Sequence, residues 1–135
     1  MPASFFDTNV LLYIASGEPA KAERAEVLIA SGGTISVQVL NEIANVARRK
    51  MRMSRDETQT FLSSLRGLLS VEPITIETHE SGLALAQRYG LSVYDAMIAA
   101  SALLADCDTL WSEDMHDTLL IDGRLRVSNP FHAAS

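Results

Sequence analysis

The sequence predicts an α/β fold with a mostly parallel sheet of four to five strands. Short β-rich runs alternate with longer stretches of helical periodicity, the pattern expected of parallel strands joined by helical crossovers. The chain has 135 residues, of which 47% are hydrophobic and 21% charged, so it has the length of one domain and enough apolar residues for a core. We therefore expect residues 1–135 to form a single domain.

Local signals place the elements of the first half. An apolar strand is followed by a short helix, and Pro19, which suits the first turn of a helix, begins a second helix. Ser36 caps the next helix, and Ser54 with Glu57 makes a capping box for the one after it. The sequence thus predicts strands at 3–6 and 34–36, and helices at 10–15, 19–30, 37–49 and from 55 onward.

The second half has equally clear breaks. Pro73 interrupts the run 71–76, which predicts a strand that is short or at an edge. Gly90 ends a helix, Ser92 caps the next one, and Asp122 with Gly123 predicts a turn. The expected elements are helices at 78–89 and 93–105, and strands at 71–76, 109–111 and 125–127.

Composition excludes several classes of protein. The single cysteine, Cys107, rules out an intramolecular disulfide and a zinc site built on thiolates. No apolar run is long enough to span a membrane, and the first residues lack the features of a signal peptide. We therefore expect a cytoplasmic protein with no membrane partner. The net charge of −6 is opposite to that of most nucleic-acid-binding proteins.

Three acids stand alone in long uncharged segments. Asp7 is the only charged residue within residues 1–17, Glu42 within 27–47 and Asp95 within 89–105. A buried carboxylate is unfavourable unless it is paired or binds a cation, and none of these segments contains a base. Asp7 and Asp114 each follow an apolar strand, and functional groups gather beyond the carboxyl ends of parallel strands. Four converging carboxylates would form an oxygen-only site suited to Mg²⁺, or to Mn²⁺.

Each acid also has an ordinary structural interpretation. Asp95 completes Ser92-x-x-Asp and can stabilise the start of a helix, and Asp7 can bond within a turn. Glu42 can be a solvated helix residue, and Asp114 can be one of several surface acids. The joint occurrence of the four acids where they can meet beyond the predicted strand ends favours the shared site.

Four segments carry a resemblance to a known family. FFDTNVLLY, the glutamate of SVQVLNEI, VYDAMIAASA and LWSEDM resemble, in order, the acidic motifs of PIN-domain ribonucleases, and more closely those of the VapC-type toxins of type II toxin–antitoxin pairs. The resemblance covers nearly the whole chain. It implies a three-layer α/β/α sandwich, a divalent metal, hydrolysis of RNA phosphodiesters, homodimers and an antitoxin partner that blocks the site.

The resemblance also assigns residues. Asp7, Glu42, Asp95 and Asp114 match the catalytic, metal-binding acids, and Asn9, Ser36 and Ser112 match the supporting polar residues. The fourth acid stays open: Asp114 comes soonest after the strand, whereas Asp117, one helical turn on, could face the same pocket as an outer-sphere or second-metal residue. We expect Glu113, between them in sequence, to be solvated.

A cluster of cations is the second feature bearing on RNA. Five of the eleven lysines and arginines fall within eight residues: Arg48, Arg49, Lys50, Arg52 and Arg55. They could hold RNA phosphates beside an acidic pocket, or simply form a solvated helix end. Two other functions compete with a nuclease. One is a non-catalytic acidic pocket that receives a basic peptide. The other is a phosphoryl-transfer domain with Asp7 as nucleophile, although neither Lys21 nor Lys50 follows a late strand, as that chemistry would need.

Overall fold

The computed structural model describes residues 3–131. Along the chain its elements are β1 (Ser4–Phe6), α1 (Thr8–Leu12), a 3₁₀ turn η1 (Tyr13–Ala15), α2 (Pro19–Ala30), β2 (Thr34–Ser36), α3 (Val37–Arg49), α4 (Arg55–Leu68), β3 (Ser70–Glu72), α5 (Ile76–Tyr89), α6 (Val93–Leu104), β4 (Thr109–Trp111), β5 (Leu120–Ile121) and β6 (Leu125–Ser128). The predicted alternation of strands and helices is confirmed.

The strands form one sheet in the order β3-β2-β1-β4-β6-β5. All neighbours are parallel except β5 and β6, which form a hairpin around the predicted Asp122-Gly123 turn. From β1 the chain builds outward first through β2 and β3, and later returns to place β4 on the other side of β1. The carboxyl ends of β1 and β4 therefore lie side by side at the point where the order of the sheet reverses, which is where open α/β sheets bind ligands.

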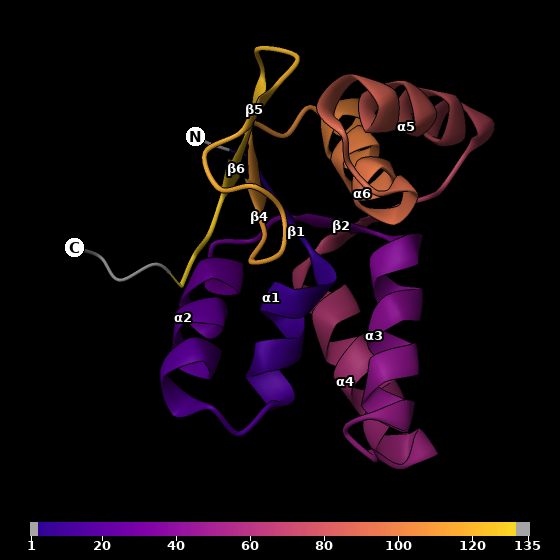
Figure 1. Ribbon diagram of the computed structural model, residues 1–135. Coiled ribbons are helices and arrows are strands. Elements are labelled where there is room, and N and C mark those ends of the chain that lie inside the picture. The colour runs from indigo at the N-terminus through magenta and orange to yellow at the C-terminus, as the bar shows by residue number, and fades with distance from the viewer. Residues whose placement is uncertain (1–2, 132–135) are drawn as a thin grey trace.

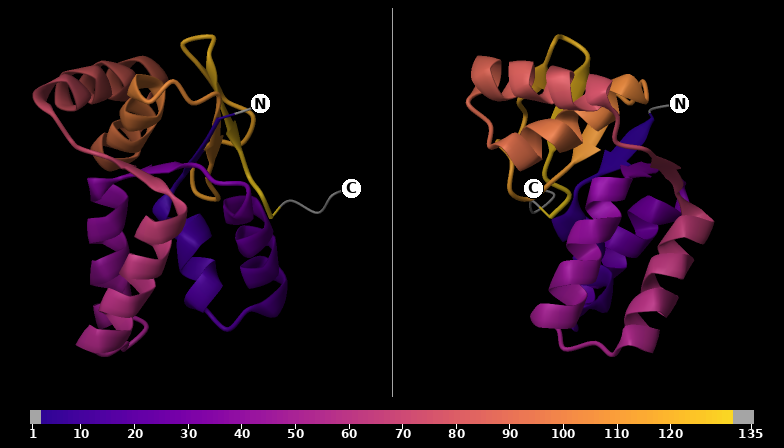
Figure 2. Two further views of the ribbon diagram at one scale, coloured as in Figure 1. Left: turned by 180° about the vertical axis from the view of Figure 1, so that it is seen from behind. Right: turned by 90° about the vertical axis from the view of Figure 1, so that its right-hand side faces the viewer.

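Helices cover the sheet in two groups. Helices α5 and α6 pack together on one side, and α1 to α4 lie on the other (Figures 1 and 2). The core between these layers is apolar, and its largest fully buried side chains include Phe5 and Phe6 of β1, Ile35 of β2 and Leu110 of β4. The predicted sandwich of helices around a mostly parallel sheet is confirmed.

Most of the predicted helix ends are correct. Ser36, Ser54 and Ser92 cap α3, α4 and α6, and Gly90 ends α5 in the left-handed conformation at φ 68°. Asp7 accepts a hydrogen bond from the backbone N–H of Thr8, so α1 begins at Thr8 rather than at residue 10.

Two predictions about strands were wrong. The run 71–76 is not one strand, because β3 ends at Glu72 before Pro73 and the Thr75 hydroxyl already caps α5. The sheet has six strands rather than four to five, because the two residues of β5 are too few to show an alternating pattern. β3 is nevertheless short and lies at the edge of the sheet, as expected. Among the described residues, no helix is long and apolar enough to cross a membrane.

Candidate active site

The first two parts of the site come from adjacent strand ends. Phe6 of β1 pairs with Trp111 of β4, so the next residues, Asp7 and Ser112, lie beside each other. The backbone N–H of Asp7 donates to the carbonyl of Trp111 at 2.9 Å, which extends the ladder by one step. The Ser112 hydroxyl donates to Asp7 Oδ2 at 2.7 Å. The register of β1 against β4 therefore places the backbone of Asp7 beside that of Ser112.

Asp7 is almost completely buried, with 4% of its surface exposed. Its Oδ1 accepts the backbone N–H of Thr8 at 2.7 Å. Burial raises the pKa of Asp7 from 3.8 to about 7; the hydrogen bonds from Ser112 and Thr8 oppose the rise, while the charges of Asp95 and Glu42 add to it. A nearby cation would stabilise the ionised form of this buried carboxyl group.

Glu42 is held at both of its oxygens. The Thr8 hydroxyl donates to Oε1, and Gln38 Nε2 donates to Oε2 at 3.0 Å. The same Gln38 nitrogen also donates to the carbonyl of Tyr94 at 3.0 Å, which ties α3 to the first turn of α6. The sequence analysis did not identify Thr8 or Gln38 as site residues. Gln38 lies one helical turn before Glu42, and this spacing could have indicated that the two side chains meet.

Asp95 serves in both of the ways that the sequence left open. Its backbone N–H donates to Ser92 Oγ at 3.2 Å, so it belongs to the capped first turn of α6. Its carboxylate also faces the other acids. Burial raises the pKa of Asp95, a hydrogen bond with Ser92 opposes the rise, and the charges of Asp114 and Glu42 add to it.

These groups line one pocket of about 270 Å³. Its walls are Asp7, Thr8, Asn9, Leu12, Glu42, Asn45, Val46, Asp95 and Asp114. All four predicted acids are present, and no lysine or arginine is among the lining residues. Four carboxylates that line one pocket with no lysine or arginine among them form a hard, oxygen-rich donor set.

The side chains are not arranged as a closed metal cage. Within residues 3–131, no three His, Cys, Asp or Glu side chains converge in a way that could hold one ion. Asp7 and Glu42 direct their oxygens to Ser112, Thr8 and Gln38 instead. The donor chemistry therefore fits a divalent cation, and binding of one ion by several acids requires these side chains to move closer together than they lie here.

Comparison with known proteins identifies the family to which this site belongs. The PIN domain family matches residues 4–116. The chain belongs to the PIN-domain family. No protein with a curated description matches the chain.

Solved structures share the fold of this PIN domain. A toxin–antitoxin complex from Klebsiella pneumoniae contains a chain that is 25% identical, with a TM-score of 0.74 and coverage of 96% of this chain and 98% of that one. DNA-bound VapBC from Salmonella typhimurium matches at 18% identity and TM-score 0.72, covering 96% and 99% of the two chains. VapC20 of Mycobacterium tuberculosis, a toxin that cleaves the sarcin–ricin loop, matches at 20% identity and TM-score 0.67, covering 83% and 92%. The predicted membership of the PIN-domain family is confirmed, and the chain shares its fold with VapC-type toxins.

The segment after β4 gives its three acids different surroundings. Asp114 is exposed and lines the acidic pocket of this PIN domain. Asp117 accepts the backbone N–H of Asn129 at 2.8 Å and is not among the pocket residues. The geometry therefore favours Asp114 as the fourth acid.

Glu113 is not solvated as we expected. Its carboxylate accepts hydrogen bonds from Lys21 Nζ and from the Tyr13 hydroxyl, both at 2.7 Å. These bonds hold the pKa of Glu113 below its ordinary value even though partial burial acts in the opposite direction. The backbone N–H of Glu113 donates to Asn9 Oδ1 at 3.2 Å. Glu113 thus fastens the loop that carries Asp114 onto α1 and α2.

The supporting polar residues separate into two groups. Ser112 contacts Asp7 directly, and Asn9 lines the pocket while holding the loop of Asp114. Ser36 is fully buried and its hydroxyl accepts the N–H of Val39 at 3.3 Å, so its observed role is to cap α3. Ser36 does not line the pocket.

The five cations of the basic cluster are all exposed. Arg49 and Lys50 line a hollow whose other residues, Asn45 and Val46, also belong to the wall of the acidic pocket. The remaining three cations, Arg48, Arg52 and Arg55, line neither hollow. The structure therefore brings two of the five predicted cations next to the acids.

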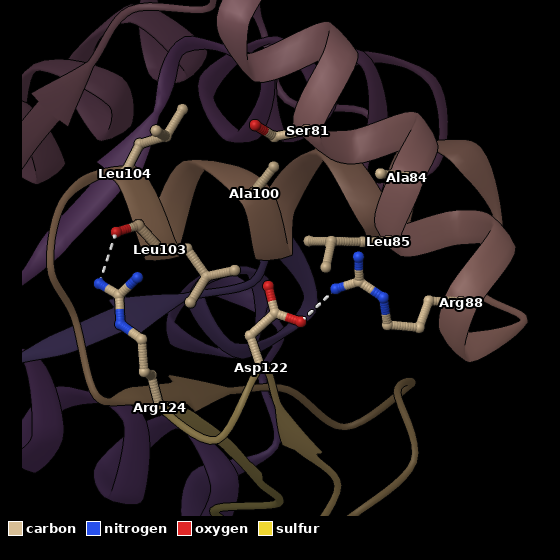
Figure 3. Close-up of a pocket in the computed structure, with 9 residues that line it drawn as sticks. All are labelled: Ser81, Ala84, Leu85, Arg88, Ala100, Leu103, Leu104, Asp122 and Arg124. Atoms are coloured by element: carbon tan, nitrogen blue, oxygen red, sulfur yellow. Dashed lines mark hydrogen bonds and ion pairs between the residues drawn. The ribbon is translucent and has the colours of Figure 1, made fainter.

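A further hollow of about 270 Å³ lies between α5, α6 and the β5–β6 turn (Figure 3). Arg88 and Arg124 border it, but Arg88 pairs with Asp122, and Arg124 bonds to the carbonyl of Leu103 and to Asp106. None of the four predicted acids lines it. The charges of this hollow fasten the hairpin onto α5 and α6, and none of its lining residues belongs to the acidic pocket.

Proposed function

We propose that this PIN domain is a metal-dependent ribonuclease that hydrolyses RNA phosphodiester bonds and acts as the toxin of a toxin–antitoxin pair. The observation that carries the proposal is the single pocket at the β1–β4 reversal point that gathers Asp7, Glu42, Asp95 and Asp114 with no cation among them. Family membership and the fold shared with toxin structures support it.

We propose Mg²⁺, with Mn²⁺ as an alternative, as the cofactor held by these acids. Bound there, it would activate water and neutralise phosphate charge during hydrolysis. Asp7 and Asp95 have raised pKa values and bind a cation in their ionised forms. Thr8 and Gln38 hold the Glu42 carboxylate in place, and Ser112 orients Asp7. Arg49 and Lys50, in the adjoining hollow, are placed to bind neighbouring phosphates of the strand.

The partners follow from the same pocket. A negatively charged pocket suits an antitoxin segment carrying an arginine, which would pair with the carboxylates and block the site. The Klebsiella pneumoniae structure of similar fold is a toxin–antitoxin complex. We also propose, from the family resemblance, that the chain forms a homodimer.

Cleavage of RNA by the purified protein tests the proposal. We expect loss of a total RNA substrate with Mn²⁺ or Mg²⁺, no loss with chelator, and products bearing 5′-phosphate and 3′-hydroxyl ends. Asp114→Ala should lose most activity, whereas Asp117→Ala and Glu113→Ala should keep more of it. Asp56→Asn, an exposed acid of α4, is the matched control and should cleave normally.

The competing functions give different results. A peptide-binding pocket would leave RNA intact at every metal concentration. An aspartyl phosphotransferase would incorporate phosphate at Asp7, yet no lysine lines the pocket, and Lys21 is engaged by Glu113 instead. Metal-independent RNA loss that survives Asp7→Asn would indicate a contaminating nuclease and would remove support for the proposal.

A further inference from the structure

A mostly apolar hollow of about 280 Å³ adjoins the acidic pocket. Its lining residues are Asn9, Leu12, Tyr13, Ser16 and Met51. Asn9 and Leu12 also line the acidic pocket, so the two hollows share a wall. A ligand larger than the acidic pocket can therefore reach into the apolar hollow.

The aromatic wall of this hollow is held in place before any ligand binds. The Tyr13 hydroxyl donates to Glu113 Oε1 at 2.7 Å and accepts from Lys21 Nζ at 3.0 Å. The ring of Phe131 meets the Tyr13 ring edge to face, with centroids 4.9 Å apart and an interplanar angle of 72°. Because the ring is fixed, binding against it loses little side-chain freedom.

A positively charged hollow also adjoins the acidic pocket, near the end of α3. Arg49 and Lys50 line this hollow, which shares Asn45 and Val46 with the acidic pocket. The face thus offers cations for an anionic backbone, acids at its centre, and an apolar aromatic wall beside them. This combination complements a single strand of nucleic acid, which has an anionic backbone and flat, apolar base faces.

We propose that the hollow between Tyr13 and Met51 receives one nucleobase of the RNA strand whose backbone crosses the acidic pocket. This inference rests on the ribonuclease activity proposed above and adds to it a subsite for specificity. Unpaired RNA bases stack on aromatic side chains, and the thioether of Met51 is a soft surface against an aromatic ring. Asn9 also lines the hollow, and its amide N–H groups can bond to the edge of a base.

Cleavage of oligonucleotides that each lack one base tests the subsite. The probe is a set of single-stranded RNAs that contain a mapped cleavage site and a single abasic nucleotide at successive positions. In the wild type, we expect kcat/KM to fall about tenfold when the base at one position next to the cut bond is missing, a loss typical of one stacking contact. In Tyr13→Leu the same abasic substitution should lower kcat/KM by less than about twofold, because the aromatic ring of residue 13 is already absent.

Two further variants separate stacking from structural damage. Tyr13→Phe keeps the ring but loses the bonds to Glu113 and Lys21, so its overall rate can fall while its sensitivity to the missing base stays near tenfold. Met51→Ala shortens a second lining side chain that is not part of the Tyr13–Glu113–Lys21 network, and we expect the missing base to lower kcat/KM of this variant about threefold. Circular dichroism melts identify any variant that fails to fold.

Several results would overturn the inference. If each abasic position lowers kcat/KM of the wild type and of Tyr13→Leu by the same factor, the base is recognised elsewhere. If Tyr13→Leu and Met51→Ala instead change the sedimentation coefficient and leave base sensitivity intact, the hollow is a protein interface. If the wild type cleaves no RNA with Mn²⁺, the proposed function fails and the subsite falls with it. Cleavage that tolerates every abasic position removes the subsite alone.

Discussion

Asp7 shows how folding and chemistry oppose each other at one residue. The folded chain buries this carboxyl group and raises its pKa from 3.8 to about 7, so the native state binds its proton more tightly than the unfolded state does. Stability from this group is therefore present at low pH and is lost as pH rises from about 4 to about 7. At neutral pH and without metal, the ionised Asp7 disfavours the fold by an amount on the order of 4 kcal/mol.

We predict that Asp7→Asn abolishes RNA cleavage and leaves the fold intact. The amide keeps the shape of the side chain, can still bond to Thr8 and Ser112, and carries no charge. In chelator at pH 8, the variant should melt at a higher temperature than the wild type. A markedly lower melting temperature would instead show that the carboxylate is structural.

The same variant gives a pH signature. Because only the wild type loses the contribution of Asp7 between pH 4 and 7, the difference in melting temperature should grow in favour of Asp7→Asn across that interval and level off above it. Thermal melts in chelator at several pH values measure this difference. A difference that does not change with pH would contradict the raised pKa.

Gln38 did not stand out in the sequence, yet we expect its substitution to affect catalysis. Its amide nitrogen joins Glu42 to the carbonyl of Tyr94, next to Asp95. We predict that Gln38→Met, which keeps the length of the side chain but no donor, lowers kcat about tenfold and raises the Mn²⁺ concentration needed for half-maximal thermal stabilisation. Gln87→Met, an exposed change on α5, is the control and should do neither. Unchanged metal dependence would mean that Gln38 does not position Glu42.

At the scale of elements, two glycines show how closely the pieces pack. Gly33 precedes β2 at φ +155°, and a Cβ there would lie 2.5 Å from the Phe6 ring and 3.0 Å from the carbonyl of Ser4. Gly67 lies within α4, and a Cβ there would meet nothing within 4 Å. The same substitution should therefore have opposite effects at the two sites.

We predict that Gly33→Ala destabilises the protein by about 2–4 kcal/mol, because it adds backbone strain and pushes β2 away from β1. Gly67→Ala should stabilise it by about 0.5–1 kcal/mol, since alanine is the better helix former. Urea unfolding curves of the two variants and the wild type measure both effects. A stable Gly33→Ala protein would mean that β1 and β2 can separate without loss.

At the scale of the whole molecule, the acidic pocket joins β1, α3, α6 and the segment after β4. Its like charges repel one another across elements that are distant in sequence, so a cation that binds the folded state should stabilise all of them together. We predict that Mn²⁺ raises the melting temperature of the wild type, and that the rise shrinks in Glu42→Gln and Asp95→Asn. Asp56→Asn should keep the full rise, and equal shifts in all four proteins would argue against a shared site.

The proposed antitoxin partner gives a second prediction at this scale. A peptide with the sequence of the antitoxin tail should inhibit RNA cleavage, and replacing its arginine by alanine should weaken inhibition at least tenfold, because a charged hydrogen bond to the carboxylates of the pocket is lost. The inhibition should also weaken as salt is raised. Equal inhibition by a tail with no basic residue would show that charge pairing is not what blocks the pocket.

Most of the helices and strands, and the candidate acids, could be predicted from residues close together in the chain. Local features carry these: Ser36, Ser54 and Ser92 cap the helices that follow them, and the acids stand out because their neighbours are uncharged. The ordered motifs around Asp7, Glu42, Asp95 and Asp114 predicted the family. Such signals lie within a few residues of one another, so they can be seen without knowing how the chain folds.

The tertiary structure alone decided which side chains meet. Glu113 looked solvated because its partners, Lys21 and Tyr13, are 92 and 100 positions away in the chain. Gln38 was not singled out because its bond to Tyr94 spans 56 positions, and β5 was missed because its pairing with β6 rather than its composition makes it a strand. Contacts of this kind depend on sheet order and helix packing, which bring together residues far apart in the chain. They produce no periodic pattern in the sequence.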